Sequence, residues 1–114
     1  MKRIPTKNPD LVWRDEPAEK ERILAALEKG EEVADEGWVI IVDGGVINQL
    51  NLLAGEMWLL CDGVRDEEAI AEELAEGYEA PVEMILEDVA AFVDDCAKRG
   101  WLVINSPTSG GREG

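Results

Sequence analysis

The sequence predicts an α+β fold, and three observations support this prediction. The chain has 114 residues, of which 46% are hydrophobic, and this size and composition suit one core. Strand patterns come early, at residues 11–14 and 37–50, and helical patterns dominate from residue 51 onward. Segregation of strands from helices along a chain is typical of α+β folds rather than of parallel βαβ sheets.

One domain is predicted over residues 11–104. Residues 1–10 are expected to form a flexible lead-in, because Pro5 and Pro9 interrupt regular structure. Residues 105–114 are rich in Ser, Thr, Pro and Gly, and this composition predicts a disordered tail.

Residues 17–36 are expected to insert an acidic helical region between the first two strands. Pro17 suits the first turn of a helix, and Gly30 suits the position just past its end. The apolar face of this helix consists of Ile23, Leu24 and Leu27. A helix this short is marginal in isolation, so it must pack against something.

A β-hairpin is the strongest local signal. The run 37–42 is rich in β-branched residues and ends at Asp43-Gly44-Gly45, where the glycines allow the positive φ of a tight turn. The return strand is predicted at residues 46–50. Along it, Val46, Asn48 and Leu50 share one face.

Three helices and a short strand are predicted to follow. Asn51 is expected to cap a helix over 52–62 that is apolar all round, as central helices are. Asp66 is expected to cap the second helix, and the third is predicted from Pro81 to Arg99. A final strand is predicted at residues 101–104. A hairpin beside two short helices and a longer one is the layout of a winged helix-turn-helix.

Charge limits the partners. The formal net charge is −15, and the segment 66–100 carries −10 of it. Nucleic-acid binding needs clustered Lys and Arg, so this segment argues against a DNA or RNA partner. A basic peptide or protein would be favoured. No apolar run approaches the ~20 residues that span a membrane.

The residue types present do not predict catalysis. The chain has no His, which removes histidine bases and most zinc or haem ligands. Cys61 and Cys96 are expected to be buried apolar residues in a reducing cytosol, so the prediction is a cytoplasmic protein. No carboxylate pair has the apolar surroundings of a general acid and base. We therefore predict a non-enzyme without a metal ion or cofactor.

A binding groove remains as the candidate site. The strand at 46–50 is a candidate edge strand. The apolar arc of the helix at 81–99 is about 160° wide, which is wider than packing against one neighbouring element requires. An edge strand beside such a helix could accept an extended peptide. Coverage of that arc by the helix at 18–29 or by a second subunit is the open alternative.

The sequence resembles the PqqD family over about residues 38–104. The resemblance lies in the stretch LNLLAGEMWLLCDG at 50–63, in Ile70 with Leu74 and Tyr78, in Asp88-Val89 with Phe92, and in Gly100-Trp101-Leu102. Residues 17–36 depart from compact relatives by insertion, and Trp101 stands where Leu is usual. A comparable N-terminal extension favours the PqqD-like proteins that are paired with SPASM-type radical SAM maturases.

The resemblance implies a RiPP recognition element, which binds the leader of a ribosomally made precursor peptide and delivers it to a modifying enzyme. That enzyme is commonly a radical SAM protein with auxiliary iron–sulfur clusters. The leader would add as a strand to 46–50 and pack on the helix at 81–99. The implied peptide-binding residues are Val46, Ile47, Asn48, Gln49, Leu50, Ile85, Val89 and Phe92.

The two alternative function classes are a winged-helix transcriptional regulator and a dimerisation module. A winged-helix transcriptional regulator would need basic residues on its recognition helix, and the helix at 66–77 has none. A dimerisation module could use the same apolar stripe, so the chain is expected to be a monomer or a homodimer.

Overall fold

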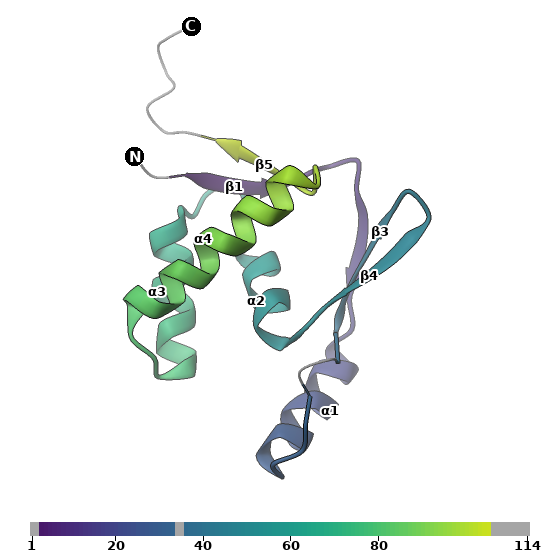
Figure 1. The fold of residues 1–114 in the computed structure, drawn as a ribbon, viewed down its shortest axis with the longest axis vertical. Helices are drawn as coiled ribbons and strands as arrows, with labels where there is room; N and C mark the ends of the chain where they lie inside the picture. Colours follow the sequence, from purple (N-terminus) through teal and green to yellow (C-terminus); the bar gives the residue numbers. More distant parts are fainter. Residues whose placement is uncertain (1–2, 34–35, 106–114) are drawn as a thin grey trace, which may run out of the picture. The chain divides into compact units, whose positions relative to one another are not determined.

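The computed structural model describes residues 3–33 and 36–105, so the predicted tail lies outside the described residues from 106 onward. The elements in chain order are β1 (Ile4–Lys7), β2 (Val12–Asp15), α1 (Pro17–Glu28), β3 (Val39–Asp43), β4 (Val46–Leu50), α2 (Leu52–Leu60), α3 (Glu67–Tyr78), α4 (Val82–Lys98) and β5 (Leu102–Asn105) (Figure 1). They confirm the predicted α+β class, with strands concentrated early and helices late.

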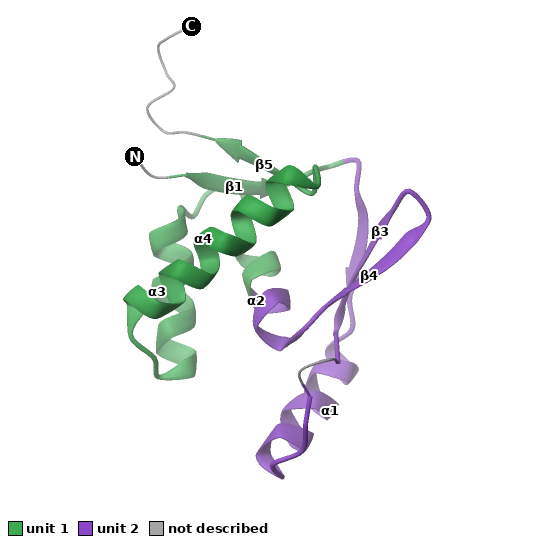
Figure 2. Cartoon of the chain, viewed as in Figure 1, with its two compact units in different colours: residues 1–9, 57–114 green, residues 10–56 purple. Residues whose placement is uncertain are grey.

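Two compact units make up the chain (Figure 2). We call residues 10–56 the sheet unit, and residues 1–9 with 57–114 the helical unit. The prediction of one domain over 11–104 stays a prediction.

The sheet unit contains a three-stranded antiparallel sheet in the order β2-β3-β4. A tight turn joins β3 to β4, and its central residues Gly44 and Gly45 have φ of 58° and 84°. Both values lie in the left-handed region that glycine enters without a Cβ penalty, as the hairpin prediction requires. The bounds of β4 are those predicted from the sequence.

The inserted helix is present as α1, and it buries Ile23 and Ala26. Lys20 on this helix forms an ion pair with Glu56 at 2.6 Å between Nζ and Oε2. The same ammonium lies 4.8 Å from the ring centroid of Trp38. The half-buried ion pair and the cation–π contact therefore help to hold α1 in place, in addition to the burial of its apolar side chains.

The helical unit packs α3 along α4 and pairs β1 with β5. Its main buried apolar residues are Met57, Trp58, Cys61, Ile70, Leu74, Ile85, Val89, Val93, Cys96, Trp101 and Leu102. Asp66 caps α3 by accepting a bond from the N–H of Ala69 at 2.8 Å, as predicted. In the sheet unit, the first turn of α2 is capped likewise, since Asn51 accepts a bond from the N–H of Ala54 at 3.0 Å.

The prediction of a flexible lead-in at 1–10 is wrong for Ile4–Lys7, which forms β1. Pro5 lies in this strand opposite Ile104 of β5. Proline is tolerated because β1 belongs to a two-stranded sheet, where half of the main-chain groups need no ladder partner. The carbonyl of Pro5 also accepts a bond from the N–H of Gly63 at 2.9 Å.

The remaining differences are shifts of element ends. The helix predicted over 52–62 ends at Leu60, and the last strand begins at Leu102. In the described part of the chain, no helix is long and apolar enough to cross a membrane.

Candidate functional site: the open edge of β4

Strand β4 is the edge of its sheet. It pairs with β3 on one side, and among the described residues no strand pairs with its other side. The tight turn fixes the register, which places Val42 opposite Ile47 and Ile40 opposite Gln49. An edge strand carries unpaired main-chain donors and acceptors, which form a template for another extended chain.

The main-chain groups of Ile47 and Gln49 are the ones that face this open side. The carbonyl of Leu50 accepts a bond from the N–H of Trp38 at 3.0 Å, so the main chain of Leu50 faces β3. In an antiparallel ladder, successive residues direct their main-chain groups to alternate sides. Asn48 therefore faces β3 as Leu50 does, and Ile47 and Gln49 face outward.

The two faces of the sheet differ in burial. One face carries Val39 and Ile41, which are both fully buried. The other face, which we call the outer face, carries Val12, Arg14, Ile40, Val42, Ile47 and Gln49. On it, 66% of Val12 and 67% of Ile47 are exposed. A hollow of about 310 Å³ is lined by Val12, Trp13, Arg14, Ile40, Val42 and Ile47.

The end of the edge near Gln49 is polar. A second hollow there is lined by Gln49, Gly37, Glu16, Glu19, Glu36 and Arg22. Arg22 forms ion pairs with both Glu19 and Glu36. The edge thus passes from an apolar surface at Ile47 to a charged surface beyond Gln49.

The predicted residues of α4 lie in the helical unit, and their burial divides them. Ile85 is 6% exposed and Val89 is 0% exposed, so both belong to the core of that unit. Phe92 is half-buried and keeps some accessible surface. The peptide-binding roles of Ile85, Val89 and Phe92 stay predictions, and only Phe92 presents accessible surface in the absence of a peptide.

Sequence reasoning did not single out Val12, Ile40 or Val42. The available signal was the alternation of side chains along each strand, because it shows which residues of that strand share a face. Their common face could be recognised only once the pairing of β2 with β3 across the inserted helix was known.

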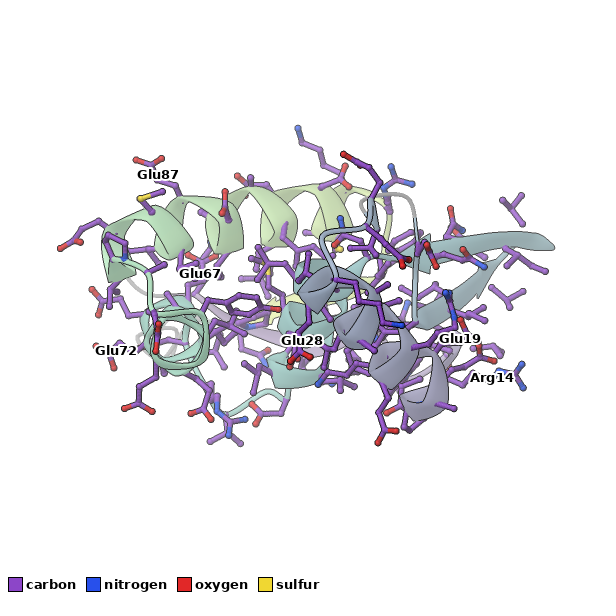
Figure 3. The ribbon with its side chains drawn as sticks, turned by 90° about the horizontal axis from the view of Figure 1, so that it is seen from below. Arg14, Glu19, Glu28, Glu67, Glu72 and Glu87 are labelled. Carbon is purple, nitrogen blue, oxygen red and sulfur yellow. The ribbon has the colours of Figure 1, made fainter. Side chains whose placement is uncertain are left out.

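The acidic residues of α3 and α4 are mostly exposed, and Figure 3 shows Glu87 projecting outward from α4. One basic residue joins the two helices: Arg3 pairs with Glu67 of α3 at 2.6 Å and with Asp94 of α4 at 2.5 Å. The hydrogen bond from Arg3 holds the pKa of Asp94 below its usual value.

Neither thiol has the surroundings of a nucleophile. Burial raises the pKa of Cys61 and of Cys96 to about 12, so both stay protonated near neutral pH. Within residues 3–33 and 36–105, no group of three or more His, Cys, Asp or Glu side chains is placed to hold a metal ion.

Two curated relatives share part of the sequence, and both carry the name PqqA binding protein. The protein from Bradyrhizobium diazoefficiens is 39% identical over 67 residues, which cover 59% of this chain and 64% of the relative. The protein from Rhodopseudomonas palustris (strain TIE-1) is 40% identical over 65 residues, which cover 57% and 63%. The chain thus spans slightly less than two thirds of the length of each relative.

A solved structure shares the fold. It is the solution NMR structure of the PqqD truncation of Methylobacterium extorquens PqqCD, described as a functional and stand-alone RiPP recognition element. The TM-score is 0.59 at 18% sequence identity, and 87% of each chain is covered. The sequence model of the family Coenzyme PQQ synthesis protein D (PqqD) matches residues 21–102, a stretch that includes β3, β4 and the last three helices. This chain belongs to the PqqD family.

Proposed function

We propose that this protein is a non-catalytic recognition element that binds the leader segment of a ribosomally made precursor peptide as an added strand on β4. The observation that carries the proposal is the open edge of β4 in a member of the PqqD family. Two relatives named for binding PqqA, and a fold shared with a RiPP recognition element, support it.

Strand addition suits this edge for a physical reason. Main-chain bonds supply affinity whatever the side chains are, and the alternate side chains of the guest supply specificity. Ile47 and Gln49 direct two donors and two acceptors outward over three residues. A tight turn and a paired β3 hold these groups in place before binding, which lowers the ordering cost.

The proposal includes a role in delivery. A bound leader leaves the rest of its precursor free for an enzyme to modify, and the predicted enzyme is a radical SAM/SPASM maturase. Its iron–sulfur clusters would belong to that enzyme, and this chain would supply no cofactor of its own.

A proline substitution tests the main-chain pairing directly. Gln49→Pro removes an outward-facing N–H while the bonds of Asn48 and Leu50 toward β3 remain. Gln49→Ala is the matched control, because it shortens the same side chain and keeps the N–H. The probes are synthetic leader segments of short reading frames found beside this gene, measured by isothermal titration.

We expect Gln49→Ala to bind as the parent does and Gln49→Pro to lose at least about tenfold in affinity, equivalent to about 1.4 kcal/mol. Circular dichroism must show that both variants stay folded. Equal binding by the two variants would contradict strand addition at β4. Failure of the parent to bind any leader segment would contradict the peptide-binding role itself.

A further inference from the structure

The structure points to a specificity rule on the outer face of the sheet. We infer that Val12, Val42 and Ile47 form a cross-strand row that selects an aliphatic side chain at one position of the bound peptide. This inference rests on the proposed function, since it concerns the strand that would add to β4. It assigns one face of the edge, and one class of residue, to that recognition.

The register defines the row. Val12 of β2 lies opposite Val42 of β3, which lies opposite Ile47 of β4. Residues that lie opposite one another in an antiparallel ladder have their side chains on the same face. A strand added antiparallel to β4 would extend the row by one residue, which would lie opposite Ile47 and project from the outer face.

Two observations indicate that the peptide residue at this fourth position should be apolar. All three members of the row are β-branched and line the hollow of about 310 Å³, which the added side chain would help to cover. The row also ends on a side chain that is 67% exposed at the open edge. An aliphatic partner would bury the outward side of Ile47, whereas a charged one would lose hydration beside three apolar residues.

The neighbouring charges offer no compensation for an acidic guest residue. Arg14, the basic residue that lines the hollow, already pairs with Glu16 at 2.9 Å. The sheet unit also carries surplus negative charge, with 12 acidic and 4 basic residues between 10 and 56. An aspartate or glutamate opposite Ile47 would therefore be the worst choice.

The next row provides an internal contrast. Arg14, Ile40 and Gln49 lie opposite one another, so this row ends at the edge on a polar side chain. The peptide residue opposite Gln49 lies two positions from the residue opposite Ile47 and projects from the same face. Polar residues should be accepted there. The rule is therefore that the peptide needs an aliphatic residue opposite Ile47 and accepts apolar or polar residues two positions away, opposite Gln49.

A display library of random 12-residue linear peptides, selected against the full chain, tests the rule without knowledge of the natural precursor. We expect the selected peptides to share an aliphatic position, and alanine at that position should weaken binding about fivefold. Hydrogen exchange of the complex should show that the amides of Ile47 and Gln49 become protected.

A positive charge introduced into the row gives the decisive variant. Selection against Ile47→Lys should replace the aliphatic preference by Asp or Glu at the same position. Val103→Lys is the matched control, because Val103 is also β-branched and 45% exposed but lies on β5, outside the sheet unit. It should leave the aliphatic preference unchanged.

The outcomes separate this inference from the proposed function. Protection of Ile47 and Gln49 by peptides without an aliphatic preference would overturn the rule and leave strand addition intact. Failure to select any peptide would overturn both. A chain that selects no peptide but sediments as a dimer, and becomes monomeric as Ile47→Lys, would assign the row to a second copy and overturn the rule.

Discussion

Gly55 on α2 lies directly against the indole ring of Trp38: a Cβ at Gly55 would lie 2.4 Å from Nε1 of that ring. The indole N–H donates to the carbonyl of Leu52 at 3.3 Å, and the ring is 2% exposed. A glycine in a helix normally costs stability, so its presence here is explained by the close approach of the ring.

Gly55→Ala should therefore destabilise the protein by about 1–3 kcal/mol, because the added methyl group must displace a buried indole. Gly77→Ala is the control: Gly77 is also helical, but nothing lies within 4 Å of its Cβ position. This control should gain about 0.5–1 kcal/mol. Urea unfolding measures both, and an unchanged midpoint for Gly55→Ala would refute the steric explanation.

The two thiols should be inert in the folded protein. Burial raises the pKa of Cys61 and Cys96 to about 12, so the reactive thiolate is scarce at about pH 8. Ellman's reagent should detect no thiol before unfolding, and both after unfolding in guanidinium chloride. Rapid labelling of the native protein at either cysteine would contradict this expectation.

Asp62 should contribute stability that depends on pH. Its Oδ1 accepts bonds from the N–H groups of Arg65 at 3.0 Å and Val64 at 2.9 Å, and the bond from Arg65 contributes most to holding its pKa below the ordinary value. A carboxylate with a lowered pKa stabilises the fold above its unfolded pKa, and this contribution is lost as pH falls through the folded pKa.

Asp62→Asn keeps an oxygen acceptor but removes the charge. At neutral pH it should cost at most about 1 kcal/mol, since the group is exposed to solvent. The difference between parent and variant should vanish in acid below the folded pKa of Asp62. A difference that persists unchanged into strong acid would show that charge is not its cause.

Lys7 should stabilise the C-terminal end of α2. Its Nζ donates to the carbonyl of Cys61 at 2.9 Å and to that of Leu59 at 3.3 Å, and it lies 5.8 Å from the ring centroid of Trp58. Lys7→Met should cost about 1–2 kcal/mol, because it leaves these carbonyls without their donor. Lys98→Met, at an exposed position on α4, should change stability by less than about 0.5 kcal/mol. Equal effects of the two substitutions would contradict a capping role.

Local chemistry explains which parts of the fold could be predicted from the sequence. The caps at Asn51 and Asp66 and the turn at Gly44-Gly45 each depend on residues that are close in the sequence. The sequence therefore predicts them correctly. Strand β1 depends on β5, with Ile4 opposite Asn105 near the other end of the described chain. Nothing in the neighbourhood of Pro5 signals such a distant partner.

The same distinction applies to the site. The limits of β4 follow from its turn, and they were predicted correctly. The apolar neighbours of Ile47 on the outer face include Val12 of β2. This strand pairs with β3, although the inserted helix separates the two strands in the sequence. The width of the apolar arc on α4 could not show which positions are covered, and Val89 proves to be fully buried.

Burial should decide how the predicted site residues respond to a charge. Ile47→Asp should leave the fold intact and abolish leader binding, because 67% of the Ile47 side chain is exposed at the edge. Val89→Asp should instead unfold the helical unit, because a carboxylate would replace a side chain that is 0% exposed. Phe92→Asp should also abolish leader binding, and its thermal unfolding must be measured alongside because Phe92 is half-buried. Circular dichroism and titration with the leader segments separate the effects. A folded Val89→Asp variant, or an Ile47→Asp variant that binds normally, would show that exposure does not distinguish these positions.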